Sequence, residues 1–202
     1  GGQSFPRTCY GADKTGLYLL QTLYEQCVEQ GVRFYDEFLV LSLIVRESRC
    51  YGVVSYEIAT GEIHGFQAQA VIFATGGAGR LFSLTSNSLI STGFGVSMAY
   101  LAGARLKDME FFQFHPTTLV GQGTTISEGL RGAGAYLLNG NGERFMANYV
   151  SESVMERAPR DITARSIQTE IDEGRGIDGG PFVHLDARHL GAEWLLTYFP
   201  GI

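Results

Sequence analysis

The residues best suited to chemistry lie between positions 111 and 132, in the stretch FFQFHPTTLVGQGTTISEGLRG. It holds an imidazole at His115, a carboxylate at Glu128 and a guanidinium at Arg131, with hydroxyl side chains and glycines between them. Pro116 pushes His115 out of helical geometry into an extended bend. Glu128 and Arg131 are three residues apart, so their side chains would be neighbours on a helical turn. The imidazole, hydroxyl and guanidinium donors suit a small carboxylate ligand. The alternative is a solvated turn with an ordinary surface ion pair.

A second group of charges lies at the start of a predicted helix over 157–174, where Pro159 suits the first turn. Asp161 is explained by the helix dipole, which favours an acid in the first turn. Arg157 and Arg160 can be surface charges, or they can face a ligand. The stretch HLDARH offers three possible metal ligands, but a strand end and a helix cap explain it better, so no metal site is predicted.

The elements that position these groups begin with a helix from Asp13 to Glu29, which Gly31 ends. The mostly apolar run over 32–45 predicts a buried strand. It is followed by two strands that are joined by a turn at Thr60-Gly61.

A further apolar run, Ala70–Ala74, predicts a second buried strand that ends in the glycine-rich sequence TGGAG. Backbone without side chains can approach a pyrophosphate or a flavin closely. The order of elements is typical of an α/β nucleotide-binding domain. On spacing alone, however, a tight turn explains the glycines about equally well.

The composition of the sequence changes near residue 110, where we place a domain boundary. Before it, Met98–Ala104 predicts a short helix closed by Gly103. After it come loops rich in glycine and threonine, the helix over 157–174, and a short strand leading into a helix with Trp194 and Leu195.

Composition excludes several classes of protein. The 202 residues are 45% hydrophobic, enough for one core or for one domain and part of another. A net charge of −6 argues against nucleic acid as a partner, since phosphate binding needs clustered Lys and Arg. No apolar run approaches the ~20 residues of a membrane helix. Three widely spaced cysteines predict buried thiols in a reducing compartment. Because the chain starts without Met, we expect it to be an internal piece of a longer polypeptide.

Taken in order, the motifs resemble one family. GGQS, RTCYGADKTG, FATGGAGRLF, STGFG, FFQFHPT, SEGLRG, NGNGERFM, APRDITARSI and EGRG are similar to the flavoprotein subunit of succinate dehydrogenase and fumarate reductase. The resemblance covers essentially the whole chain. It implies an α/β fold with an α+β cap: residues 1–110 would be a middle portion of an FAD-binding nucleotide-binding domain, and 111–202 most of its inserted capping domain. The implied cofactor is FAD, and the implied reaction is hydride transfer between FAD and a dicarboxylate, succinate or fumarate.

The resemblance also implies roles for single residues. Arg160 would donate a proton to fumarate, and Glu128 and Arg131 would form the relay that reprotonates it from solvent. His115 would hold a substrate carboxylate together with Ser127, which stands where the family usually has threonine. The residues implied to contact the flavin are Val40, Ala74, Thr75, Gly76, Gly77 and Phe94.

The sequence differs from the family pattern at two positions. STGFG has Phe94 where the family has an aspartate that touches the flavin, and RGAGA has Ala133 where the family has glutamate. Phe94 removes an acceptor and adds a bulky ring, which weakens the expectation of normal flavin affinity. The family's GxGxxG and flavin-linking histidine would precede Gly1, and a second substrate histidine and arginine would follow Ile202. The chain alone is therefore expected to be inactive.

The partners implied by the resemblance are an iron–sulfur subunit and membrane anchor subunits that lead to a quinone. The implied location is the cytoplasmic face of the inner membrane in a bacterium, or the matrix side in a mitochondrion. The nearest rival is L-aspartate oxidase, which shares APRDI and RFM and needs no iron–sulfur partner; EGRG and HLDARHLG favour the dehydrogenase. An alternative of another class is a non-catalytic module that binds flavin or a dicarboxylate.

Overall fold

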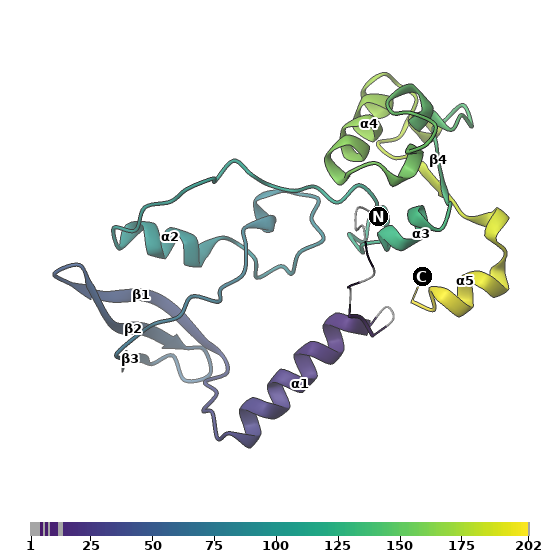
Figure 1. Ribbon diagram of the computed structural model, residues 1–202. Coiled ribbons are helices and arrows are strands. Elements are labelled where there is room, and N and C mark those ends of the chain that lie inside the picture. Colours follow the sequence, from purple (N-terminus) through teal and green to yellow (C-terminus); the bar gives the residue numbers. More distant parts are fainter. Residues whose placement is uncertain (1–4, 6, 8, 12–13, 202) are drawn as a thin grey trace. The chain divides into compact units, whose positions relative to one another are not determined.

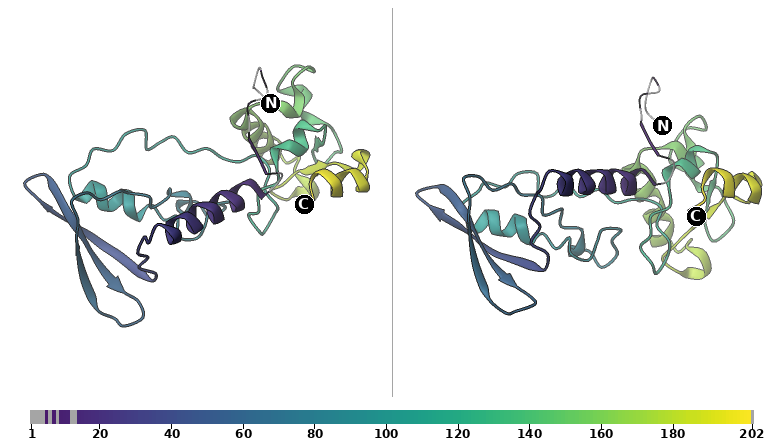
Figure 2. Two further views of the ribbon diagram at one scale, coloured as in Figure 1. Left: turned by 60° about the horizontal axis from the view of Figure 1, so that its bottom comes forward. Right: turned by 90° about the horizontal axis from the view of Figure 1, so that it is seen from below.

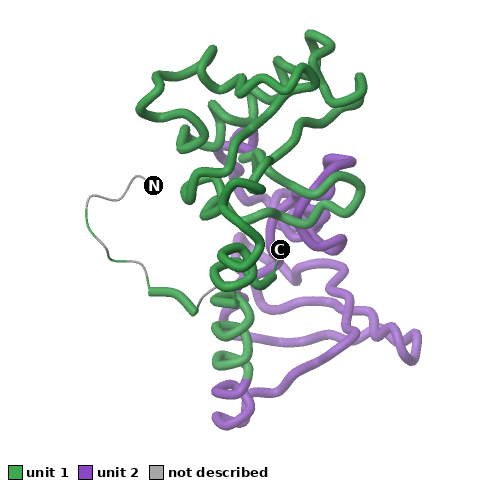
Figure 3. Tube along the Cα trace, turned by 90° about the vertical axis from the view of Figure 1, so that its right-hand side faces the viewer, with its two compact units in different colours: residues 1–24, 113–202 green, residues 25–112 purple. Residues whose placement is uncertain are grey.

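The computed structural model describes residues 5, 7, 9–11 and 14–201, and Figure 1 labels their elements. Two compact units make up the chain: unit 1 comprises residues 1–24 and 113–202, and unit 2 comprises residues 25–112 (Figure 3). The α-helices are α1 (Thr15–Glu29), α2 (Phe94–Leu101), α3 (Glu128–Gly132), α4 (Arg160–Asp172) and α5 (Ala192–Tyr198). The strands are β1 (Phe38–Arg46), β2 (Arg49–Glu57), β3 (Ile63–Gln67), β4 (Tyr136–Leu138) and β5 (His184–Asp186). Within the described part of the chain, no helix combines the length and the apolar character needed to cross a bilayer.

The first predicted helix is found as α1, although its predicted start, Asp13, lies outside the described residues. Gly31 ends the helix with a φ of 69°. Its N–H donates to the carbonyl of Val28 at 3.0 Å, and the N–H of Val32 donates to the carbonyl of Cys27 at 2.9 Å. This pair of bonds is the Schellman arrangement, which favours glycine at the left-handed position. No residue of α1 is buried, so its apolar face is exposed in this chain.

Unit 2 contains a three-stranded antiparallel sheet in the order β1-β2-β3, visible as neighbouring arrows in Figure 2. β1 and β2 are joined by Glu47 and Ser48, which both have positive φ, 51° and 61°. A two-residue hairpin of this kind needs positive φ at both positions because its twist then matches that of the strands. β2 and β3 are joined by the turn that the sequence predicts at Thr60-Gly61.

Both buried strands predicted in unit 2 need correction. The strand predicted over 32–45 begins only at Phe38, because Glu37 has a φ of 60° that an extended run cannot include. Most of β1 is exposed. Ala70–Ala74 is not a strand: it pairs with no described residue, and Ile72 is 90% exposed. A strand exists only where a neighbour satisfies its backbone groups, so apolar composition alone does not define one.

The short helix expected over 98–104 is found as α2, which begins four residues earlier at Phe94. Gly93 precedes it in the left-handed conformation, with a φ of 78°. Glycines lower helix propensity by about 1 kcal/mol each, which is why the sequence STGFG does not itself predict a helix start. α2 contacts β1 within unit 2.

The cysteines differ from the expectation of burial. Cys9 is exposed, and Cys27 and Cys50 are half-buried; all three are free thiols. The absence of disulfides among them agrees with their wide spacing.

Unit 1 is built on a small core of Leu137, Phe145, Met146 and Ala158, all buried, with Leu185 packed against it. β4 and β5 pair antiparallel, which sets Leu137 opposite Leu185. The helix predicted over 157–174 is found as α4, and the predicted strand and following helix are found as β5 and α5. The apolar residues of β4 and β5 thus join segments about fifty residues apart in the sequence.

A buried carboxylate, Glu170, ties α4 to the rest of this unit. It accepts hydrogen bonds from Asn139 at 2.8 Å, from Tyr149 at 2.7 Å and from both fork nitrogens of Arg175 at 2.7 and 2.8 Å. The hydrogen bonds from Arg175 are the main cause that lowers the pKa of Glu170 to about 2. A fully buried charge is stable only when paired in this way.

Candidate active site

A short helix holds the central carboxylate of the site. α3 starts at Glu128, and Ser127 caps it: the hydroxyl oxygen of Ser127 accepts the N–H of Gly129 at 3.2 Å. Serine is favoured at this position because it satisfies a backbone donor that the helix leaves unpaired. The acid in the first turn also suits the helix dipole. The predicted substrate-binding hydroxyl therefore already serves as a helix cap.

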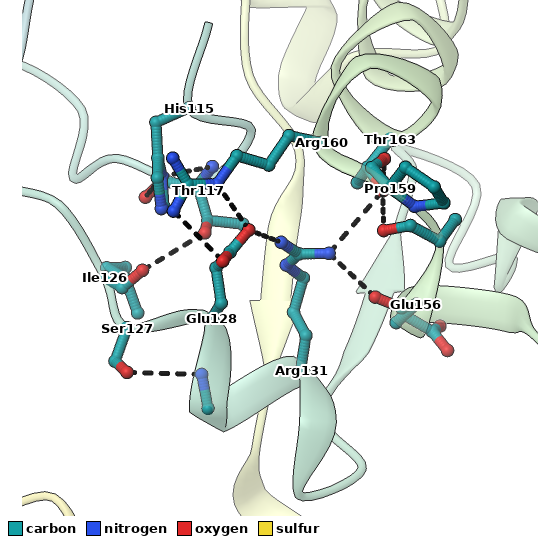
Figure 4. Close-up of polar contacts among 12 residues, drawn as sticks. His115, Thr117, Ile126, Ser127, Glu128, Arg131, Glu156, Pro159, Arg160 and Thr163 are labelled. Carbon is teal, nitrogen blue, oxygen red and sulfur yellow. Dashed lines mark hydrogen bonds and ion pairs between the residues drawn. The ribbon is translucent and has the colours of Figure 1, made fainter. Parts of the chain in front are cut away.

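Glu128 lies between two arginines from different helices (Figure 4). Its Oε1 accepts hydrogen bonds from Arg131 Nη2 at 3.0 Å and from Arg160 Nε at 2.8 Å. Its Oε2 accepts a third from Arg160 Nη2 at 3.0 Å. The remaining Nη1 of Arg160 donates to Gln113 Oε1 at 2.9 Å. The three residues that the sequence singles out as a proton-transfer group are therefore in direct contact.

Arg131 is held by the protein interior, whereas Arg160 is half-exposed. The Arg131 side chain is 3% exposed, and its Nη1 donates to the carbonyl of Glu156 at 2.7 Å and lies 3.5 Å from Thr163 Oγ1. Its Nε is buried without a hydrogen-bond partner. The side chain of Glu156 in turn accepts the fork of Arg144 at 2.8 and 2.6 Å. Arg131 also lines a pocket of about 260 Å³.

The electrostatics differ between the two arginines. The hydrogen bonds that Arg160 donates to Glu128 raise the pKa of Arg160. Burial lowers the pKa of Arg131, although Glu128 opposes this effect. The hydrogen bond from Arg160 is the first cause that lowers the pKa of the Glu128 carboxyl. At neutral pH the cluster therefore has one carboxylate between two guanidinium groups.

His115 lies beside this cluster, in the bend before Pro116 that the sequence predicts. Its Nδ1 is 2.9 Å from the carbonyl oxygen of Thr117 and 3.3 Å from the Thr117 nitrogen. The shorter distance favours a proton on Nδ1, which leaves Nε2 free for a ligand. Burial, followed by the nearby positive charge of Arg160, lowers the pKa of His115.

The residues expected to contact a flavin all lie in unit 2. Ala74, Thr75, Gly76 and Gly77 form an exposed segment without regular secondary structure. Val40 is half-buried in β1 opposite Ser55, and Phe94 is the first residue of α2, with 48% of its surface exposed. No contact in the structure tests whether these residues meet a cofactor, so their assignment stays a prediction.

This segment packs against the start of α2, where only glycine fits. A Cβ on Gly95 would lie 2.1 Å from Thr75 Oγ1, and one on Gly93 would lie 2.8 Å from the Cβ of Ala78. Gly77, by contrast, has no atom within 4 Å of the position where a Cβ would stand. Its exposed backbone, free of side chains, fits a flat ligand such as FAD.

Three contacts of the cluster were not predicted from the sequence: those of Gln113, Glu156 and Thr163. Gln113 is two residues before His115 in an extended segment, so alternation already puts both on one side. Thr163 is one helical turn after Arg160, which also indicates a shared face. Glu156 contacts Arg131 through its backbone carbonyl, for which no residue type gives a signal.

Comparison with known proteins identifies the family of this chain. Residues 1–202 match the family described as FAD binding domain. The chain is 46% identical to an uncharacterised FAD-dependent oxidoreductase of Methanocaldococcus jannaschii, over 96% of this chain and 35% of that protein. It is 42% identical to a succinate dehydrogenase flavoprotein subunit of Rickettsia conorii, over 100% of this chain and 34% of the relative. The chain thus spans about a third of the length of these curated relatives.

Solved structures give the same result for the fold. A quinol-fumarate reductase with menaquinol molecules matches with a TM-score of 0.91 at 37% identity, over 99% of this chain and 37% of that chain. The mixed α/β fold class is therefore confirmed, as is the resemblance to succinate dehydrogenase and fumarate reductase flavoproteins. Since the family match covers every residue, the chain belongs to the FAD binding domain family, and FAD is its cofactor.

Proposed function

We propose that the protein containing this chain is a flavoprotein oxidoreductase that interconverts succinate and fumarate. The observation that carries the proposal is Glu128 bridging Arg131 and Arg160, with His115 beside them. A carboxylate between two guanidinium groups is more than a surface ion pair, because one partner is buried and anchored on both sides. When bound, FAD supplies the hydride acceptor and donor for one substrate carbon.

In the reduction of fumarate, Arg160 delivers a proton to the carbon next to the one that receives the hydride. The contact with Glu128 raises the pKa of Arg160, so the guanidinium is fully protonated before the reaction. What supports the role is its position, because Nε and Nη2 of Arg160 donate to the carboxylate of the proposed relay. Donation leaves Arg160 neutral, and its cationic form has to be restored before the next turnover. The Arg160 side chain is 38% exposed, and Nη1 and Nη2 each carry a second N–H that can reach a ligand.

Glu128 and Arg131 restore that proton. Arg131, whose pKa is lowered by burial, gives up a proton more readily than Arg160, whose pKa is raised. Proton transfer from Arg131 through Glu128 to a neutral Arg160 is therefore thermodynamically favourable. A pocket of about 260 Å³ lies beside Arg131 and is also lined by Arg144 and Glu152. Protons from solvent reach the relay through this pocket.

His115 binds one carboxylate of the substrate, and the hydroxyl group of Ser127 contributes a second donor. Because the Thr117 carbonyl holds the Nδ1 proton, Nε2 donates to a carboxylate only when the imidazole takes up a second proton. A dicarboxylate beside it favours that charged form. Substrate binding at this site should thus be accompanied by proton uptake.

We further propose that residues 1–110 are a middle portion of the flavin-binding domain and that residues 111–202 form most of a capping domain. Several relatives of this chain are named as flavoprotein subunits of succinate dehydrogenase or fumarate reductase. By analogy, the partners of the whole protein are an iron–sulfur subunit and membrane anchors, and the protein is peripheral to a membrane on its cytoplasmic or matrix side.

The test uses the full-length protein that contains this chain. Purified protein should show flavin absorbance, reduce fumarate with a reduced viologen dye and oxidise succinate with an acceptor dye. Oxidation of L-aspartate by oxygen, with hydrogen peroxide as product, would instead identify L-aspartate oxidase. Flavin binding without any of these activities would identify a binding module and end the proposal.

A further inference from the structure

A second cluster of chemically active side chains lies in unit 2. Three residues of the β2–β3 hairpin, Glu57, Glu62 and His64, bring one ligand atom each within 4.8 Å of one another. Within the part of the chain that the structure describes, no other group of His, Cys, Asp and Glu does so. The proposed reaction makes no use of this cluster.

Strand register explains why the three side chains meet. Ser55 pairs with His64, so His64 shares a face of the sheet with Ser55 and, two residues on, with Glu57. The N–H of Glu57 donates to the carbonyl of Glu62 at 2.9 Å, which sets these residues opposite each other beside the turn. Two carboxylates directly opposite repel each other. A cation bound between the carboxylates of Glu57 and Glu62 would relieve this repulsion.

The distances suit a small divalent ion. His64 Nε2 is 2.9 Å from Glu57 Oε2 and 3.8 Å from Glu62 Oε2. Ligands about 2.0–2.1 Å from a tetrahedral zinc ion lie roughly 3.3 Å apart, a value between these two distances. A protonated imidazole can satisfy one carboxylate at 2.9 Å, but 3.8 Å is too long for a hydrogen bond to the other.

Neighbouring side chains hold two of the three ligands in place. Thr60 Oγ1 donates to Glu57 Oε2 at 2.9 Å, a contact of the kind that orients metal-binding carboxylates. The ring of Phe38 lies 5.3 Å from the imidazole of His64. Glu57 and His64 are 24% and 35% exposed, so an ion can reach them from solvent.

We propose that Glu57, Glu62 and His64 form a zinc site, with the fourth position of the ion open to water. One neutral imidazole and two carboxylates balance the charge of Zn²⁺, and an imidazole ligand favours such an ion over Mg²⁺ or Ca²⁺. The ion would join β2 to β3 across their turn. It would stabilise the hairpin and take no part in the reaction proposed above.

The test is titration of Zn²⁺ into the full-length protein that contains this chain, after its cysteines, Cys9, Cys27 and Cys50 among them, have been alkylated to remove thiols as ligands. We expect one ion per chain and a rise in the melting temperature. His64→Ala and Glu62→Ala should each weaken binding at least ~10-fold, the lower limit for loss of even an outer-shell partner. His184→Ala, an exposed histidine in unit 1, is the matched control and should bind as the unaltered chain does.

Each variant is checked by circular dichroism before titration. Glu62 is 72% exposed, so its replacement leaves the fold intact even if another variant unfolds. The proposal is overturned if the alkylated chain binds no stoichiometric Zn²⁺, or if Glu62→Ala and His64→Ala bind it as tightly as the control. Flavin content and fumarate reduction are not readouts here, so failure of this proposal is independent of the proposed function.

Discussion

Replacing Glu128 by glutamine tests whether the carboxylate between the two arginines acts as a unit with them. Glutamine keeps the shape of the side chain but has one acceptor oxygen and one NH₂ group. If the oxygen takes the place of Oε1, it keeps the contacts with Arg131 Nη2 and Arg160 Nε. The NH₂ group then faces Arg160 Nη2, 3.0 Å from the former Oε2 position, so two donors meet.

The size of the effect follows from that lost contact. A hydrogen bond to a charged group is worth ~1.5–3 kcal/mol. Glu128 and Arg160 are 41% and 38% exposed, so solvent screening reduces the loss to about 1–2 kcal/mol. Since 1.36 kcal/mol is a factor of ten in rate, fumarate reduction by the full-length protein should fall about 5–30-fold.

The assay is the oxidation of a reduced viologen dye by fumarate, with flavin loading equalised between samples. Asp161→Asn is the matched control, because Asp161 pairs with Arg165 at 2.7 Å on the same helix, with 65% and 76% of the side chains exposed. That control should stay within about twofold of the unaltered protein. If Glu128→Gln behaves like Asp161→Asn, Glu128 is an ordinary surface partner and the relay is wrong.

Four further changes test other parts of the structure. Arg160→Lys keeps the charge but loses the planar fork, so fumarate reduction should fall ~10²–10⁴-fold at unchanged flavin content; near-normal turnover would exclude Arg160 as the donor. His115→Ala should raise the Michaelis constant by about tens of fold, since it removes a hydrogen bond to a charged group, and a loss of turnover alone would contradict the carboxylate role. Phe94→Asp should increase flavin retention measured by absorbance after gel filtration, and equal retention would show that the pocket accommodates the ring. Glu170→Gln should lower the free energy of unfolding by ~2–3 kcal/mol at pH 7. The folded-state pKa of Glu170 is about 2, against 4.5 for an unperturbed glutamate, so its contribution to stability is complete above pH 4.5 and is lost as the pH falls towards 2. Urea denaturation at pH 7 and pH 3 should therefore show a smaller change in the free energy of unfolding for the variant than for the unaltered protein.

The sequence predicts local contacts of the site well. The spacing of Glu128 and Arg131 predicts a helical ion pair, which the structure contains at 3.0 Å. The bend at His115-Pro116 and the helix that begins near Arg160 are also found. These features depend on backbone preferences within a few residues, so a short stretch of sequence determines them.

Contacts between distant segments were not predictable from residue types alone. Arg160 and Glu128 are 32 residues apart, and the resemblance to a known family, rather than spacing, linked them. The buried strand expected at Ala70–Ala74 fails for a related reason. Apolar, β-branched composition indicates that a segment can pair, but it does not say whether a partner strand is present.

The close packing of Gly95 against Thr75 has a consequence for how the sequence can diverge. Alanine at position 95 would by itself gain about 1 kcal/mol of helix propensity, yet its methyl group would lie 2.1 Å from Thr75 Oγ1. The steric conflict outweighs the gain, and the Cβ of residue 75 would itself lie only 2.6 Å away, so alanine can be accepted at 95 only after residue 75 has become glycine. The two positions are therefore expected to change as a pair and in a fixed historical order, with residue 75 first. In a library of random variants, replacements at 95 should survive only in clones that already carry glycine at 75.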